Sequence, residues 1–278
     1  MLKTFVIETP GREASLLLRN KLAEWNLDTT YIEGVVGSEL SSTKIDGLVN
    51  LELLRHRIGY EPPLSLVGCG LSHRKVYRSI MEMGTEWALV LESDSKPVED
   101  PSCLVETLKQ EKFRNAPCVI QLFSRGERLV NRKVIARVFS GEVERARIYR
   151  FLYPPRQAAA YMINRLAAIK ALDETVLSGP PDWPSWSASV EFFAVYPWFF
   201  SETNEGSTIP TVYRGNRQNT IEKFRVLSGH DFFRSGRLYN TRLDYFRLKV
   251  KPIFLRSIWK ILGKRKLNRN GDAPWVIF

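Results

Sequence analysis

The stretch Trp87-Ala88-Leu89-Val90-Leu91-Glu92-Ser93-Asp94 joins a continuous apolar run to two acids. Five consecutive apolar residues predict a strand that is buried on both faces of a sheet. In α/β layers, ligands bind beyond the carboxyl ends of the strands, where Glu92 and Asp94 would lie. Acids one residue apart in an extended chain point to the same side, so this pair can hold a hard divalent cation that grips a diphosphate. The alternative is a solvated turn, since acids often follow strands without binding anything.

A helix is predicted directly before this strand. Its apolar stripe consists of Val76, Tyr77, Ile80 and Met83, and Gly84 ends it. A helix that leads into a buried strand indicates an α/β fold.

Other segments repeat this pattern. The predicted elements are strands over 5–7, 30–36, 118–123 and 159–163 and a helix over 14–25. Asn164 can cap a helix that follows the last of these strands. The opening strand, helix and strand are typical of nucleotide-binding α/β domains.

The glycine-containing segment Gly68-Cys69-Gly70-Leu71-Ser72-His73 precedes the predicted helix. It is not a dinucleotide fingerprint, because His73 stands where the third glycine is needed, and the sequence contains no Gly-x-x-x-x-Gly-Lys-Ser/Thr loop. Dinucleotide and P-loop chemistry are therefore disfavoured.

Several ordered motifs belong together. They lie at 5–7 with Arg12, at 45–60 (a predicted helix that ends in Arg55-His56-Arg57-Ile58-Gly59), and at 68–73, 92–94, 158–165 and 180–182. In this order they resemble glycosyltransferase family 25, the lipooligosaccharide galactosyltransferase group. The resemblance covers about residues 3–225.

The resemblance implies a GT-A-like α/β domain over residues 1–240, with a mixed, mainly parallel sheet flanked by helices. It implies an inverting transfer of galactose from uridine diphosphate galactose (UDP-galactose) to a lipid-linked oligosaccharide. Glu92 and Asp94 would hold Mn²⁺ or Mg²⁺ and bind the donor. Two positions depart from the family: Ser93 replaces the middle acid of Glu-Asp-Asp, and residues 158–160 lack the expected glycine.

Two further residues are candidates for donor binding. Arg12 follows the first strand near a helix start, a position suited to a diphosphate, although a solvated arginine would fit the same place. His73 is expected near the start of the helix before the acidic strand. The family resemblance favours a role in the substrate site; the alternative is a hydrogen-bonded structural histidine.

Asp182 is the candidate catalytic base. It lies in Pro180-Pro181-Asp182-Trp183-Pro184-Ser185-Trp186, where large apolar neighbours would desolvate the carboxylate and raise its basicity. An acceptor hydroxyl needs such a base on the face opposite the leaving group. The alternative is a turn aspartate held by proline geometry.

Composition sets outer bounds on the fold and its location. With 278 residues and 44% hydrophobic content, the chain can bury a substantial core. Cys69, Cys103 and Cys118 form no Cys-x-x-Cys pair and are predicted to be reduced, buried, small hydrophobic residues, as in the cytosol. No apolar segment reaches about 18 residues, so a transmembrane helix is not expected.

Positive charge is concentrated in residues 241–278, which carry a net +8 of the total +11. Arg256, Lys260 and Lys264 recur every four residues beside an apolar face that includes Trp259. Such a helix can lie on an anionic bilayer, which predicts a peripheral enzyme on the inner face of the cytoplasmic membrane. A terminal helix packed on the domain is the alternative.

Two classes of function therefore compete. The first is an enzyme of glycan assembly, for which no nucleic-acid partner is expected. The second is a basic module that binds membrane or nucleic acid, in which the acidic strand end is only structural. A third hypothesis is a family member that has lost catalytic turnover, which the replacement of the middle acid by Ser93 would indicate.

Overall fold

The computed structural model describes residues 1–58, 61–123, 134–150, 157–179 and 190–202. The strands are β1 (Lys3–Glu8), β2 (Asp28–Glu33), β3 (Trp87–Glu92), β4 (Ser95–Pro97), β5 (Cys118–Gln121), β6 (Val134–Ser140), β7 (Val143–Arg150), β8 (Ala160–Asn164), β9 (Glu191–Tyr196) and β10 (Phe200–Glu202). The helices are α1 (Leu16–Glu24), η1 (Gly37–Glu39), α2 (Ser42–Leu48), α3 (Leu51–Ile58), α4 (Leu64–Glu82), η2 (Pro101–Leu104), α5 (Val105–Leu108), α6 (Glu111–Arg114) and α7 (Arg165–Leu172).

Within the described residues, eight strands form one sheet in the order β2-β1-β3-β8-β5-β9-β7-β6. The β1 strand pairs in parallel with β2 and β3, and β5 pairs in parallel with β9. The other four ladders are antiparallel, because β8 and β7 run against their neighbours. Six of the eight strands therefore point the same way, which confirms the predicted mixed, mainly parallel α/β sheet.

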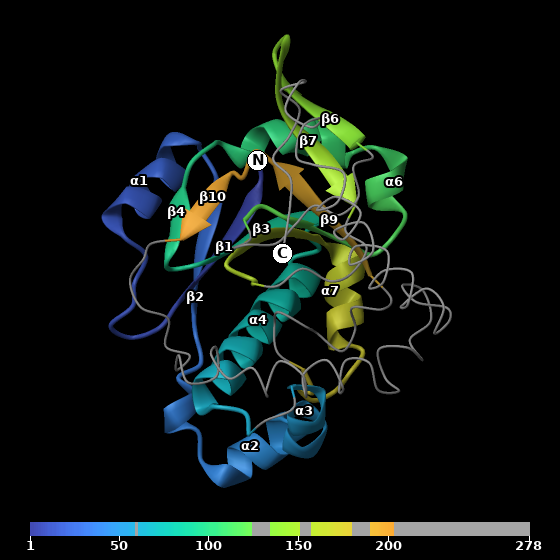
Figure 1. Ribbon diagram of the computed structural model, residues 1–278. Helices are drawn as coiled ribbons and strands as arrows, with labels where there is room; N and C mark the ends of the chain where they lie inside the picture. Colours follow the sequence, from blue (N-terminus) through green and yellow to red (C-terminus); the bar gives the residue numbers. More distant parts are fainter. Residues whose placement is uncertain (59–60, 124–133, 151–156, 180–189, 203–278) are drawn as a thin grey trace, which may run out of the picture.

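Helices cover both faces of this sheet (Figure 1). The α4 and α7 helices cover one face, where Val76, Ile80 and Ala168 pack with Val90 and Ile163 of the strands. The other face packs against α1, η2, α5 and α6. The α2 and α3 helices form a separate apolar cluster with the first half of α4. Alternate residues of each central strand thus enter different cores, which explains its unbroken apolar sequence.

The α4 helix is fixed to α7 by Arg74, which is 6% exposed. Its guanidinium donates hydrogen bonds to the backbone oxygens of Ala171, Glu174 and Thr175 just at and beyond the end of α7. Carbonyls at a helix end lack partners within the helix, so a cation there satisfies them. This contact holds α4 in place above the sheet.

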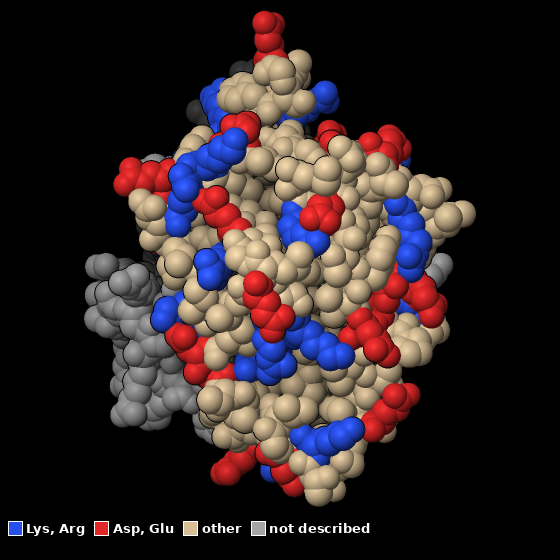
Figure 2. Space-filling view, turned by 180° about the vertical axis from the view of Figure 1, so that it is seen from behind, with Lys and Arg blue, Asp and Glu red and all other residues tan. Residues whose placement is uncertain are grey.

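Charges of both signs are interspersed on the face seen in Figure 2, opposite α4 and α7. Residues 241–278 account for +8 of the net charge of +11, and the remaining net charge of residues 1–240 is +3. A basic binding module would therefore depend on residues 241–278, which lie outside the described residues, as does the predicted boundary at 240. Among the helices that the structure describes, none has the length and apolarity to cross a membrane.

Most predicted elements are confirmed, including β1, α1, β2, β3, β5 and β8 and the cap of α7, where the Asn164 side chain accepts a hydrogen bond from the Ala167 N–H. Three expectations were wrong. The single helix over 45–60 is two helices, α2 and α3. Met83 is 55% exposed rather than part of the buried stripe. The segment 68–73 lies inside α4, which begins at Leu64, rather than before it.

The glycines of that segment permit close packing instead of breaking the helix. A Cβ at Gly68 would lie 2.3 Å from the Val35 backbone oxygen and 2.7 Å from the Gly37 nitrogen. The Ser72 hydroxyl accepts a hydrogen bond from the Val35 N–H and donates one to the Gly68 oxygen. The α4 helix therefore touches the backbone that follows β2.

Gly68→Ala is expected to lower the free energy of unfolding by about 1–3 kcal/mol, because the new methyl group meets backbone that cannot rotate away. Gly47→Ala in α2 is the matched control, since a Cβ there meets nothing within 4 Å. It should raise stability by up to about 1 kcal/mol through helix propensity. Urea unfolding of both variants measures the difference, and equal effects would contradict the close approach.

Candidate active site

The site is built around Glu92, the last residue of β3. Ala88 and Val90 face the core under α4 and α7, so strand alternation directs Glu92 to the same side. Glu92 pairs with Ile7 of β1, and its N–H donates to the Ala159 oxygen just before β8. Two neighbouring segments therefore fix its backbone.

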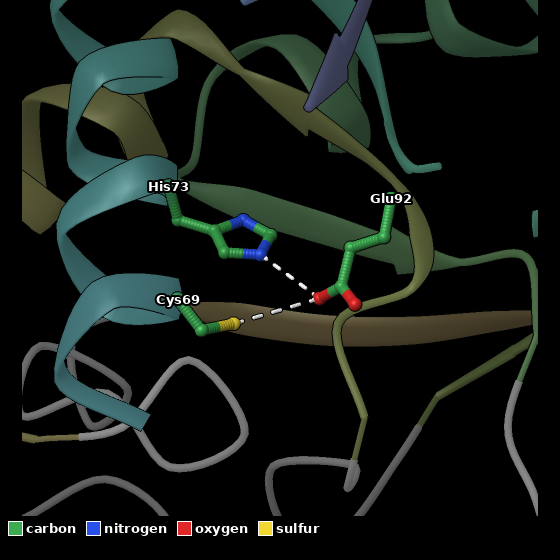
Figure 3. A group of neighbouring side chains, drawn as sticks. All are labelled: Cys69, His73 and Glu92. Atoms are coloured by element: carbon green, nitrogen blue, oxygen red, sulfur yellow. Dashed lines mark hydrogen bonds and ion pairs between the residues drawn. The ribbon is translucent and has the colours of Figure 1, made fainter. Parts of the chain in front are cut away.

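Three residues spaced by four along α4 face this strand end. Cys69, His73 and Tyr77 recur with the helical period and so share one side of the helix. Figure 3 shows the Cys69 and His73 side chains directed at one carboxylate oxygen of Glu92. His73 Nε2 lies 3.2 Å from Glu92 Oε1, and the Cys69 thiol donates to the same oxygen at 3.7 Å.

The polar chain continues inward from His73. His73 Nδ1 lies 2.7 Å from the Tyr161 hydroxyl, and this hydroxyl donates to the Tyr77 hydroxyl at 3.1 Å. Burial raises the pKa of both tyrosines well above the ordinary value, so both keep their protons at neutral pH. The Tyr161 ring also stacks on His73, with ring centroids 5.7 Å apart. These contacts hold the imidazole in one orientation.

Exposure to solvent decreases from Glu92 inward to His73. The Glu92 side chain is 31% exposed, whereas that of His73 is 2% exposed. Cys69 is partly buried. The group therefore meets solvent at the Glu92 and Cys69 end, on the side where a ligand could arrive.

Asp94 lies beyond the end of β3. Ser93 and Asp94 form a turn between β3 and β4, so the extended geometry that predicted a side-by-side pair of acids stops at Glu92. The Ser95 hydroxyl anchors this turn by donating to the Ala159 oxygen at 2.7 Å. Metal binding by Glu92 and Asp94 stays a prediction.

Arg12 is exposed in the loop between β1 and α1. Its N–H donates to the Thr9 oxygen, and Gly11 takes a positive φ of 73° to make that turn. Because β1 and β3 are parallel and Ile7 pairs with Glu92, this loop leaves the same edge of the sheet as the acidic turn. Donor binding by Arg12 therefore remains consistent with its position.

The remaining predicted site residues lie outside the described residues. They are Asp182 and the membrane-facing set Arg256, Trp259, Lys260 and Lys264.

Sequence reasoning missed the roles of Cys69, Tyr77 and Tyr161. Cys69 was expected to be a buried, small hydrophobic residue, but it is only partly buried and donates to Glu92. The three cysteines are free, as expected. The i, i+4, i+8 spacing of Cys69, His73 and Tyr77 was the available signal for a shared polar face.

The side-chain atoms near the strand end that could bind a metal ion are of two kinds. The carboxylates of Glu92 and Asp94 are ligands that hard cations such as Mg²⁺ and Mn²⁺ prefer, so these residues fit the cofactor that the family resemblance implies. Cys69, His73 and Glu92 instead form a group of sulfur, nitrogen and oxygen atoms that lie within 4.8 Å of one another.

One solved structure that aligns with this protein is described as the crystal structure of A197 from STIV. It aligns at 11% sequence identity with a TM-score of 0.31 over 59% of this chain and 65% of that chain. This protein thus spans less than two thirds of that structure's length, and the likeness carries no argument. No curated protein matches the sequence.

A family model described as glycosyltransferase family 25 (LPS biosynthesis protein) matches residues 9–177, more than half of the chain. The matched region includes Arg12, the polar face of α4, Glu92, Asp94 and Tyr161. The chain that builds this acidic strand end therefore belongs to glycosyltransferase family 25.

Proposed function

We propose that this protein is an inverting glycosyltransferase that moves galactose from UDP-galactose to a lipooligosaccharide or related surface-glycan acceptor. The observation that carries the proposal is the acidic turn at the end of β3, beside the β1 loop with Arg12, within the part of the chain that matches the family. Ligands of α/β sheets bind at this edge.

The donor diphosphate would meet Asp94, Glu92 and Arg12. Its negative charge grows as the glycosidic bond breaks, so groups placed to oppose that charge accelerate the reaction. A bound Mn²⁺ or Mg²⁺ would supply positive charge for the leaving diphosphate. Asp94 and Glu92 would hold this ion, and Arg12 would contact phosphate oxygens.

His73 would act on the donor site through Glu92. It contacts the Glu92 carboxylate directly, and Tyr161 fixes the imidazole. A carboxylate held in one position loses less conformational freedom when it binds a ligand. His73 is therefore a positioning residue in this proposal.

Asp182 would take the proton of the acceptor hydroxyl. A single displacement from the face opposite the diphosphate inverts the anomeric centre. Support for this role comes from the apolar sequence around Asp182, which follows the region that matches the family model.

The acceptor is proposed to be lipid-linked, so the enzyme would work at the cytoplasmic membrane surface. Residues 241–278 provide the two attractions that surface binding needs, a net charge of +8 and a broad apolar face. The second candidate function, a basic membrane-binding module, is favoured by the same charge. It leaves the acidic end of β3 without a role.

Asp94→Asn is expected to abolish galactose transfer and to preserve the fold, because it removes one charge from the proposed cation site. Transfer of labelled galactose with and without Mn²⁺, together with circular dichroism, measures both. Asp46→Asn on the exposed surface of α2 is the matched control and should retain activity. Undiminished, metal-stimulated turnover of Asp94→Asn would rule out its role.

Asp182→Asn is expected to lower the turnover rate by about two to four orders of magnitude, as loss of a general base usually does. Donor affinity should change little, and equilibrium binding of UDP-galactose measures it. If affinity collapsed while the rate at saturation held, Asp182 would be a binding residue instead.

Deletion of residues 252–278 is expected to release the protein from anionic vesicles, since each basic residue near such a surface contributes about 1 kcal/mol. Transfer to a small soluble acceptor should remain largely intact. Vesicle sedimentation at several salt concentrations is the measurement. Unchanged binding would show that the anchor lies elsewhere, and loss of folding would assign the apolar face to the core.

A further inference from the structure

We propose that Cys69, His73 and Glu92 form a binding site for zinc-type divalent ions, with three protein ligands and an open fourth position. This site is separate in chemistry from the hard-cation site proposed at Asp94 and Glu92, although both use Glu92. Its ligand atoms would be Cys69 Sγ, His73 Nε2 and Glu92 Oε1, which lie within 4.8 Å of one another.

Two of the three separations between these atoms match a tetrahedral zinc site, and the third, from Cys69 Sγ to His73 Nε2, is at most 4.8 Å. Zinc–ligand bonds of about 2.0–2.3 Å at tetrahedral angles place nitrogen and oxygen ligands about 3.3 Å apart, and sulfur and oxygen ligands about 3.6 Å apart. In the structure, Nε2 and Oε1 are 3.2 Å apart, and Sγ and Oε1 are 3.7 Å apart. A charge-assisted N–H···O hydrogen bond is typically shorter, about 2.7–2.9 Å.

The contacts around His73 also suit a metal ligand. His73 Nδ1 lies 2.7 Å from the Tyr161 hydroxyl, so Nε2 is the ring nitrogen directed at the Glu92 carboxylate. Histidines that ligate metals usually have their other ring nitrogen held by such a hydrogen-bond partner.

The charges of the metal-bound group would balance. A neutral imidazole, a carboxylate, a thiolate and Zn²⁺ have zero net charge together, so a bound ion leaves no uncompensated charge beside the core. Binding requires the Cys69 thiol to lose its proton, so metal affinity should rise with pH.

The type of ligand selects the metal. Thiolate and imidazole favour zinc-type ions over Mg²⁺ and Mn²⁺, which prefer oxygen. The ion could enter from solvent because the Glu92 side chain is 31% exposed and Cys69 is partly buried. Three protein ligands with an open position describe a site that can also contact a bound molecule.

The test uses the full-length protein after removal of metals with a chelator, titrated with Co²⁺ and then with Zn²⁺. The expected result is a near-ultraviolet thiolate-to-cobalt charge-transfer band that saturates at a single equivalent and is displaced by Zn²⁺. Cys69→Ala should abolish the band. Cys103→Ala, which removes another partly buried thiol, is the matched control and should keep it.

Two further variants separate this site from its surroundings. Tyr161→Phe should weaken Zn²⁺ affinity by about 10–100-fold, since it removes the partner of Nδ1. Asp94→Asn should keep the cobalt band even where galactose transfer is lost, so the two proposals can fail independently. The absence of a band in the wild-type protein, or a band that survives in folded Cys69→Ala, would overturn the inference. If Cys69→Ala does not fold, the cobalt band of the wild-type protein and the Zn²⁺ affinity of Tyr161→Phe test the inference instead.

Discussion

The contact between α4 and the end of β3 is the constraint on which the site depends. Gly68 allows the helix backbone to touch the segment that follows β2, and Arg74 ties the same helix to α7. With the helix fixed, its four-residue period places His73 against Glu92. A shift of α4 by one residue would rotate that side chain away from the strand, since each residue turns the helix by about 100°.

Burying this polar chain is costly unless its members satisfy one another. His73 is 1% exposed, and Tyr161 is 3% exposed. Their hydrogen bonds to each other and to Glu92 and Tyr77 replace the lost contacts with water. The result is a rigid base beneath the acidic turn. Asp94 and Arg12 lie in loops at the same edge of the sheet, the usual place for functional residues.

Much of the fold could be predicted because local patterns determine it. The five apolar residues of β3 follow from burial on both faces, and the cap at Asn164 follows from its side chain. The start of α4 could not be predicted from local signals. Gly68 and Gly70 look like helix breakers, but they are needed where the helix meets Gly37 and Leu177, both distant in sequence.

The site was predictable in its location more than in its contacts. The acids after β3 lie at the edge of the sheet that the sequence predicted for them, beside the β1 loop. The contact of His73 with Tyr161 joins residues 88 positions apart, a distance over which periodicity carries no information. The turn at Ser93 and Asp94 also depends on Ser95 donating a hydrogen bond to Ala159, which directly precedes β8. The side-chain contacts of the site therefore depend on long-range packing, which the sequence pattern does not show.

The central claim is that this sheet edge binds a nucleotide sugar and transfers its sugar. The most direct measurement is incubation of the protein with a panel of labelled nucleotide sugars and a lipooligosaccharide acceptor, with and without Mn²⁺. The account predicts transfer of label from UDP-galactose, stimulated by the metal and accompanied by release of UDP. Absence of transfer and of donor binding across the whole panel, with the protein folded, would contradict it.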